Sequence, residues 1–220
     1  MNIEAKTQRI ESLLYYRVKP VLEIRIDYPC FSGKLSQKSE HILNSYYLHR
    51  AKNLNTYART KLYPEAVTHF RKSKSNGYEF NFHTFYHTFQ PTFLSQNLIS
   101  LYEDQSVYTG GAHPYTQRFS QTWDVCTPKI LKLKNFFSPQ FRYADYFIKE
   151  IIRQIECSKN KDDYFDGVAG LVRKYFNENN FYITSKGFVI YYPLYTIAPY
   201  YTGIQTFTIP FSYFSQKNIK

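Results

Sequence analysis

Apolar and polar positions alternate along several parts of the chain, as they do in a β-strand with one buried face. In residues 20–28, Val21 and Glu23 fall on the side opposite to Leu22. The same alternation predicts strands at residues 78–93, 98–108, 115–125 and 205–211. Pro91 should interrupt its strand or place it at a sheet edge, because proline donates no hydrogen bond to a ladder.

A short turn between two apolar runs predicts a β-hairpin over residues 181–192. Gly187 would supply the left-handed residue of a three-residue turn, since glycine adopts positive φ without steric cost.

A period near 3.6 predicts helices elsewhere in the chain. The longest covers residues 36–62, with Ser36 as its N-cap. Shorter helices are expected at residues 64–72, 141–157 and 163–177. In residues 3–18, the spacing of Ile10, Leu13 and Leu14 predicts a short amphipathic helix or a flexible arm.

This order of elements predicts the α+β class, with two packed halves that each combine helix and antiparallel sheet. The three consecutive strands between residues 78 and 125 predict an antiparallel meander. We expect an N-terminal arm at residues 1–19, a first half at residues 20–112 and a second half at residues 113–216.

Composition adds two features to this picture. The chain has 23 Tyr and 19 Phe against one Trp and one Met, which indicates either AT-rich coding or an aromatic binding surface. A formal charge of +11 favours anionic partners such as nucleic acid, lipid headgroups or a wall polymer.

Cys30, Cys126 and Cys157 show no metal-binding spacing, which indicates free thiols in a reducing compartment. The N-terminal residues lack an apolar signal region, and no run of about 18 apolar residues occurs. We therefore expect no membrane span and a cytoplasmic protein, unless the sequence lacks its export segment.

The least ordinary local feature is the Thr-Gly-Gly-Ala-His-Pro stretch at residues 109–114. His113 could be an imidazole positioned beside a ligand groove. We favour a turn in which Gly110 and Gly111 both supply positive φ and His113 bonds locally. The turn would then act as a hinge between the sheets of the two halves.

No residue is predicted to be catalytic, because no nucleophile or phosphate-loop motif occurs. His83 and His87 share one face of a predicted strand, with Cα atoms about 13 Å apart, too far to share a metal. We expect them on a strand surface. No metal and no cofactor are predicted, and Asp104 and Asp124 show no sign of forming an acid–base pair.

Two surfaces are candidates for recognition. Basic residues gather on the predicted helices and the loop after them, namely Arg59, Lys61, Arg71, Lys72 and Lys74. They indicate either an anion-binding surface or a solvated helix face. The aromatic loop with Pro199, Tyr200 and Tyr201 is either a recognition loop or a structural turn.

Four segments resemble one bacterial family in their order and spacing. They are the Tyr-Thr-Gly-Gly-Ala-His-Pro stretch at 108–114, the Leu-Lys-Leu-Lys-Asn-Phe-Phe stretch at 131–137, the hairpin at 181–192, and the Tyr-Thr-Ile-Ala-Pro-Tyr stretch at 195–200. The chain is thus similar to the sensor domain of the lysozyme-responsive anti-sigma-V factor over roughly residues 20–215. This family also occurs beside the catalytic domain of a peptidoglycan deacetylase and in uncharacterised Firmicute proteins.

The resemblance implies a binding domain without catalysis of its own, in a family whose members are often extracytoplasmic. The sigma-binding segment and the membrane helix of the anti-sigma factor have no counterpart here. Lysozyme is a possible partner, although it is strongly basic and a chain of charge +11 would be repelled at long range.

The sequence therefore predicts a non-enzymatic binding or sensor domain that recognises a cell-envelope protein or an anionic polymer. One alternative is a cytoplasmic interaction protein with nucleic-acid affinity. Another is an accessory of a peptidoglycan-active hydrolase, with His113 in a catalytic role.

Overall fold

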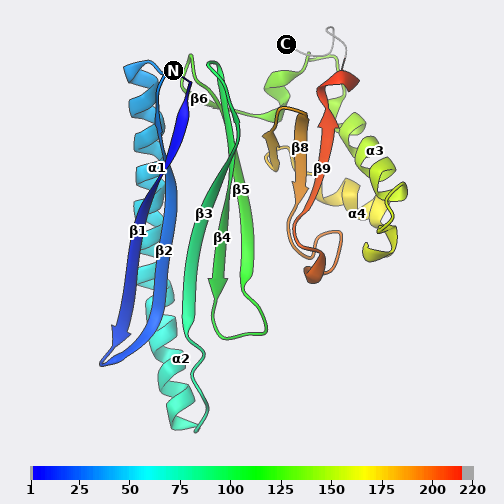
Figure 1. Cartoon of the computed structure of the whole chain (residues 1–220). Coiled ribbons are helices and arrows are strands. Elements are labelled where there is room, and N and C mark those ends of the chain that lie inside the picture. Colours follow the sequence, from blue (N-terminus) through cyan, green and yellow to red (C-terminus); the bar gives the residue numbers. More distant parts are fainter. Residues whose placement is uncertain (1, 215–220) are drawn as a thin grey trace. The chain divides into compact units, whose positions relative to one another are not determined.

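The computed structural model describes residues 2–214 (Figure 1). A six-stranded sheet has the order β1-β2-β3-β4-β5-β6, and a three-stranded sheet has the order β7-β8-β9. The first sheet contains β1 (Glu4–Tyr16), β2 (Lys19–Ser32), β3 (His83–Leu94), β4 (Leu98–Tyr108), β5 (Tyr115–Asp124) and β6 (Lys129–Leu131). The second contains β7 (Phe181–Ile183), β8 (Gly187–Tyr192) and β9 (Gln205–Pro210).

The helices are α1 (Gln37–Tyr57), α2 (Tyr63–Ser75), α3 (Tyr143–Glu156) and α4 (Val168–Tyr175). A π-helical turn, η1 (Ala58–Leu62), joins α1 to α2. Four 3-10 turns complete the elements: η2 (Leu133–Phe136), η3 (Lys161–Asp163), η4 (Tyr200–Thr202) and η5 (Phe211–Tyr213). The α+β prediction is confirmed.

The pair β2 and β3 is parallel, whereas the sequence predicted antiparallel sheet. β2 and β3 run parallel from Leu22–His83 to Ile26–His87. Parallel neighbours need a long crossover connection, and here α1, η1 and α2 provide it. The ladder ends four residues before Pro91. Pro91 therefore lies inside β3 without interrupting it, beyond the stretch where its missing N–H would face β2.

Residues 4–16 form a strand, so the prediction of a helix or flexible arm there is wrong. β1 pairs antiparallel with β2 from Glu4–Ser32 to Tyr16–Lys19. Ile10, Ser12 and Leu14 are less exposed than Glu11 and Leu13, which is the alternation of a strand. Ile10 and Leu14 are four residues apart, a spacing that places two side chains on one face of either a helix or a strand.

Two compact units divide the chain. Unit 1 comprises residues 1–90 and 103–117, and unit 2 comprises residues 91–102 and 118–220. β3, β4 and β5 each contribute residues to both units, so a single boundary in the sequence does not describe them.

The core of unit 1 lies between its sheet and the helices α1 and α2 (Figure 1). These helices come directly after β1 and β2 in the sequence. Leu22, Ile24 and Phe85 are fully buried there. Ser36 caps α1 as expected, accepting a hydrogen bond from the Ser39 N–H at 3.1 Å. The Asn44 side chain fixes α1 against β2, because it accepts from the Phe31 N–H at 2.7 Å and donates to the Phe31 carbonyl at 2.9 Å.

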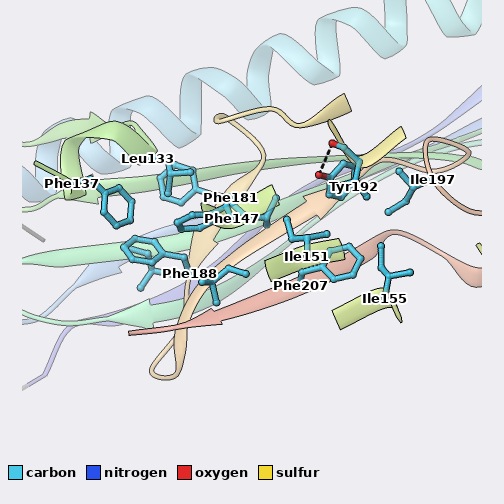
Figure 2. Packing of buried hydrophobic residues seen from close by; sticks show 14 of the residues in the cluster. Leu133, Phe137, Phe147, Ile151, Ile155, Phe181, Phe188, Tyr192, Ile197 and Phe207 are labelled. Carbon is cyan, nitrogen blue, oxygen red and sulfur yellow. Dashed lines mark hydrogen bonds between the residues drawn. The ribbon is translucent and has the colours of Figure 1, made fainter. Parts of the chain in front are cut away.

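The core of unit 2 is mostly aromatic and aliphatic (Figure 2). Phe147, Ile151 and Ile155, from the stripe that predicted α3, are buried in it. Phe137 packs on Phe147 and Phe188 with ring centroids 5.7 and 5.3 Å apart. Much of the unusual aromatic content therefore fills this core.

Gly187 does not have the left-handed conformation predicted for it, since it is not among the residues with positive φ. It lies at the start of β8, opposite Pro210 of β9. A Cβ at this position would overlap the Ile209 carbonyl oxygen and lie 2.8 Å from the Pro210 Cα. Glycine is required because two backbones approach closely.

Candidate functional site

In the turn at residues 109–114, the backbone of Gly110 has a positive φ and accepts a hydrogen bond. Gly110 has φ +96°, and its carbonyl accepts a hydrogen bond from Asn81 Nδ2 at 3.0 Å. A Cβ on Gly110 would lie 2.9 Å from His69 Cε1. Gly111 lacks positive φ and has open space around it, so the prediction that both glycines supply left-handed geometry is wrong for Gly111. His113 is exposed, with Nδ1 3.3 Å from the Pro114 carbonyl.

His69, whose ring approaches Gly110, belongs to a histidine pair. His69 Nδ1 lies 2.9 Å from His83 Nε2, and Phe80 stacks on the His83 ring at 5.6 Å. His83 and His87 are 2% and 1% exposed, so the expectation of a surface strand is wrong for both. His83, Phe85 and His87 occupy every second position of β3, so all three side chains lie on its buried face.

His83 is neutral at physiological pH. Burial, and then the neighbouring His69, lowers the pKa of His83 from 6.5 to about 4. Its Nδ1 is buried without a hydrogen-bond partner among residues 2–214. An unprotonated nitrogen is the less costly occupant of such a site, so Nε2 carries the proton and donates to His69.

This burial predicts a pH-dependent stability. Between pH 6.5 and about 4, the unfolded chain protonates His83 and the folded protein does not. Stability is therefore lost as the pH falls through this window, by about 2–3 kcal/mol from this group. The free energy of unfolding, measured with urea at several pH values from 7 to 4, should fall more steeply for the wild type than for His83→Gln. His49→Gln, on the exposed side of α1, should follow the wild type, and parallel curves for all three proteins would contradict the assignment.

A second buried polar cluster joins β2, β3, β4 and α1. Glu103 Oε2 accepts from Arg50 Nε at 2.6 Å, and Glu103 Oε1 lies 3.2 Å from His87 Nε2. His87 Nδ1 donates to the Asp27 carbonyl at 2.9 Å. Both ring nitrogens thus lie near oxygen atoms, although among residues 2–214 neither His87 Nε2 nor Glu103 Oε1 has a partner with hydrogen-bond geometry.

Unit 1 also has a groove of about 690 Å³. Its walls are mainly apolar, with Leu13, Pro20, Phe70, Phe80 and Phe82, and its polar members are Glu11, Ser12, Lys19 and Glu23. Ligand sites typically measure roughly 300–1,000 Å³ and combine apolar walls with a few polar groups. The groove has this size and composition.

The two carboxylates of the groove, Glu11 and Glu23, lie on the neighbouring strands β1 and β2. Tyr86 donates its hydroxyl to Glu23 Oε2 at 2.7 Å. This hydrogen bond, and then burial, raises the pKa of Tyr86 to about 12. Among residues 2–214, this is the hydrogen bond that Glu23 makes through its carboxylate. Glu11 lies beside Leu13, on the more exposed side of β1.

The predicted basic surface lies on η1 and α2 and is partly engaged with β1. Arg59 donates to Ser12 Oγ at 2.6 Å. Arg71 donates to the Tyr16 hydroxyl at 2.9 Å and its guanidinium carbon lies 4.8 Å from the Tyr16 ring centroid. This hydrogen bond lowers the pKa of Tyr16. Lys61, Lys72 and Lys74 are exposed.

The aromatic loop of unit 2 borders a small polar pocket. Pro199 precedes η4, and the Tyr200 ring packs on Tyr195 at 5.6 Å. Tyr201 is 73% exposed and donates its hydroxyl to Asp163 Oδ1 at 3.2 Å. The pocket beneath has a volume of about 290 Å³.

Other expectations concern ligands and compartment. Residues 2–214 contain no group of three or more His, Cys, Asp or Glu that could hold a metal ion. Cys30, Cys126 and Cys157 are free thiols. Within the same residues, no helix combines the length and the apolar character that crossing a membrane requires.

Two parts of the chain match two different protein families. Residues 134–212 match the DUF3298 family model. That family is described as proteins of unknown function. Residues 17–116 match a second family model, described as deacetylase PdaC. The DUF3298 segment contains the polar pocket, and the PdaC-like segment contains most of the groove.

Two solved DUF3298 proteins share the fold. One is from Bacteroides fragilis, with 18% identity and a TM-score of 0.74 over 100% of this chain and 96% of the other. The second is from Pseudomonas aeruginosa, with 18% identity and a TM-score of 0.62 over 99% and 94%. No curated protein sequence matches this chain. The chain is therefore similar in fold to DUF3298 proteins, whose function is unknown.

Proposed function

We propose that this protein is a non-catalytic binding domain and that the groove of unit 1 holds its ligand. The observation that carries the proposal is the combination of aromatic walls with Glu11 and Glu23 in a space of about 690 Å³. Exposed apolar surface of this kind is typical of interaction sites.

The chemistry of the groove favours a protein segment with an apolar side chain beside a cationic one. Phe70, Phe80 and Phe82 offer apolar surface. Glu11 and Glu23 offer acceptors for a guanidinium or ammonium group. Among the charged residues that line the groove, two are acidic and only Lys19 is basic, although Arg59 donates to Ser12 in its wall; the chain as a whole carries +11. A basic partner is therefore compatible with the groove in spite of repulsion at long range.

The proposal predicts charge-selective peptide binding. A fluorescent peptide that contains phenylalanine, leucine and two arginines should bind saturably, and the same peptide with two glutamates should not. Glu11→Lys should weaken the arginine peptide about tenfold, or about 1.4 kcal/mol, and Leu13→Ser should weaken it by a similar factor. Fluorescence polarisation at two salt concentrations measures both effects.

Glu4→Lys is the matched control, because Glu4 lies on the same strand and outside the groove. Equal effects of Glu4→Lys and Glu11→Lys would refute the groove as the site. Lysozyme, used as a folded basic probe, tests the sensor hypothesis in the same assay. Salt-sensitive DNA binding that depends on Lys72 and Lys74, without peptide binding, would favour the nucleic-acid alternative instead.

A further inference from the structure

We propose that the polar pocket of unit 2 is a separate binding site for one neutral sugar ring. It is lined by Asp163, Asn160 and Tyr201, with Ser158, Thr202 and Gln205 among its other walls. The site lies entirely in unit 2, on residues that the groove does not use.

Hydrogen bonds within the chain hold the walls of the pocket in place. Gln205 Nε2 donates to the carbonyls of Thr202 and Gly203 at 2.9 and 3.3 Å, and Gln205 Oε1 accepts from the Tyr164 hydroxyl at 2.9 Å. The loop is anchored by Ile197, which is fully buried and accepts from the Phe165 N–H at 3.1 Å. Binding therefore loses little conformational entropy in the walls.

Two side chains retain hydrogen-bonding capacity. Asp163 accepts from Tyr201 through Oδ1, which leaves Oδ2 as an acceptor. The Asn160 amide can both donate and accept. Adjacent sugar hydroxyls each donate one hydrogen bond and accept others, so a carboxylate beside an amide is their complement. An anion is disfavoured by Asp163, and one carboxylate is too few for a bare divalent cation, which prefers several oxygen ligands.

An exposed aromatic ring lies at the pocket, and the loop that carries it also contains a residue with positive φ. The Tyr201 ring is 73% exposed at the pocket, where it can pack against the C–H face of a sugar ring. Tyr195, in the same loop, has φ +63°, a conformation that costs energy for a residue other than glycine. The pocket volume of about 290 Å³ lies at the lower end of the range for ligand sites, which suits a single ring.

The experiment is a titration of the full chain with methyl glucopyranoside and N-acetylglucosamine, followed by amide chemical shifts in NMR. We expect saturable shifts in residues 158–164 and 198–205. Asp163→Ala and Tyr201→Ala should each weaken binding at least about tenfold, because a hydrogen-bond acceptor or a stacking surface is lost.

Asp162→Ala is the matched control, since Asp162 is the preceding residue of η3 and does not line the pocket. It should bind as the wild type does. Tyr201→Ala changes an exposed side chain, so it keeps the test valid if Asp163→Ala does not fold. The proposal is overturned if neither sugar binds, if glucosamine or another amine binds without the neutral sugars, or if Asp162→Ala and Asp163→Ala weaken binding equally.

Discussion

Glu103→Leu is expected to destabilise unit 1 by about 3–5 kcal/mol, the cost of breaking a buried charge pair. Glu103 is fully buried, and its carboxylate contacts Arg50 at 2.6 Å and His87 at 3.2 Å. Leucine would leave the 1%-exposed His87 side chain without this partner. Urea unfolding followed by far-UV circular dichroism measures the loss, and hydrogen exchange of α1 amides assigns it to unit 1.

Glu103→Gln separates hydrogen bonding from packing. Its amide oxygen can accept from Arg50, and its amide N–H can donate to His87 Nε2 while His87 Nδ1 keeps its bond to the Asp27 carbonyl. We therefore expect a loss of only about 1 kcal/mol. If the two variants lose the same stability, the hydrogen-bond network is not what Glu103 contributes.

Gly187→Ala is expected to destabilise unit 2 by about 3 kcal/mol, because overpacking against backbone cannot be relieved by a rotamer change. The added Cβ would meet the carbonyl group of Ile209 and the Cα of Pro210 in the paired strand. Fluorescence of Trp123, the only tryptophan of the chain, reports on unit 2 specifically. A lower unfolding midpoint in urea, with an unchanged slope, is the expected result.

Gly170→Ala is expected to have the opposite effect on the stability of unit 2. Gly170 lies in α4, and a Cβ there would meet nothing within 4 Å. Alanine in a helix should stabilise unit 2 by up to about 1 kcal/mol. An equal response of the two variants would show that the close approach at Gly187 does not control its stability.

The local elements were largely predictable because they depend on neighbouring residues. The Ser36 cap and the stripe through Phe147 and Ile151 predicted α1 and α3, and alternation predicted β2. The N-terminal strand was not predictable in this way. Ile10 and Leu14 fit two periods, and pairing with β2 decided between them.

The candidate sites were less predictable, because their members are far apart in the chain. The Thr-Gly-Gly-Ala-His-Pro turn was visible in the sequence, but its contact with His69 was not. His83 and Phe85 lie two positions apart, so they share one face of the strand. An apolar Phe85 on that face was a signal in the sequence that His83 is buried. The loop at Tyr201 was a candidate from its composition, whereas Asp163 had no distinguishing signal.

By itself, the sequence determined the α+β class, most helices and strands, the basic charge and the aromatic content. These follow from local periodicity and from counts of residues. Only the tertiary structure decided that Arg50 meets Glu103, that His69 meets His83, and that Tyr201 meets Asp163. Such contacts depend on strand register and on the packing of helices and loops, which bring together residues with no relation in the local pattern.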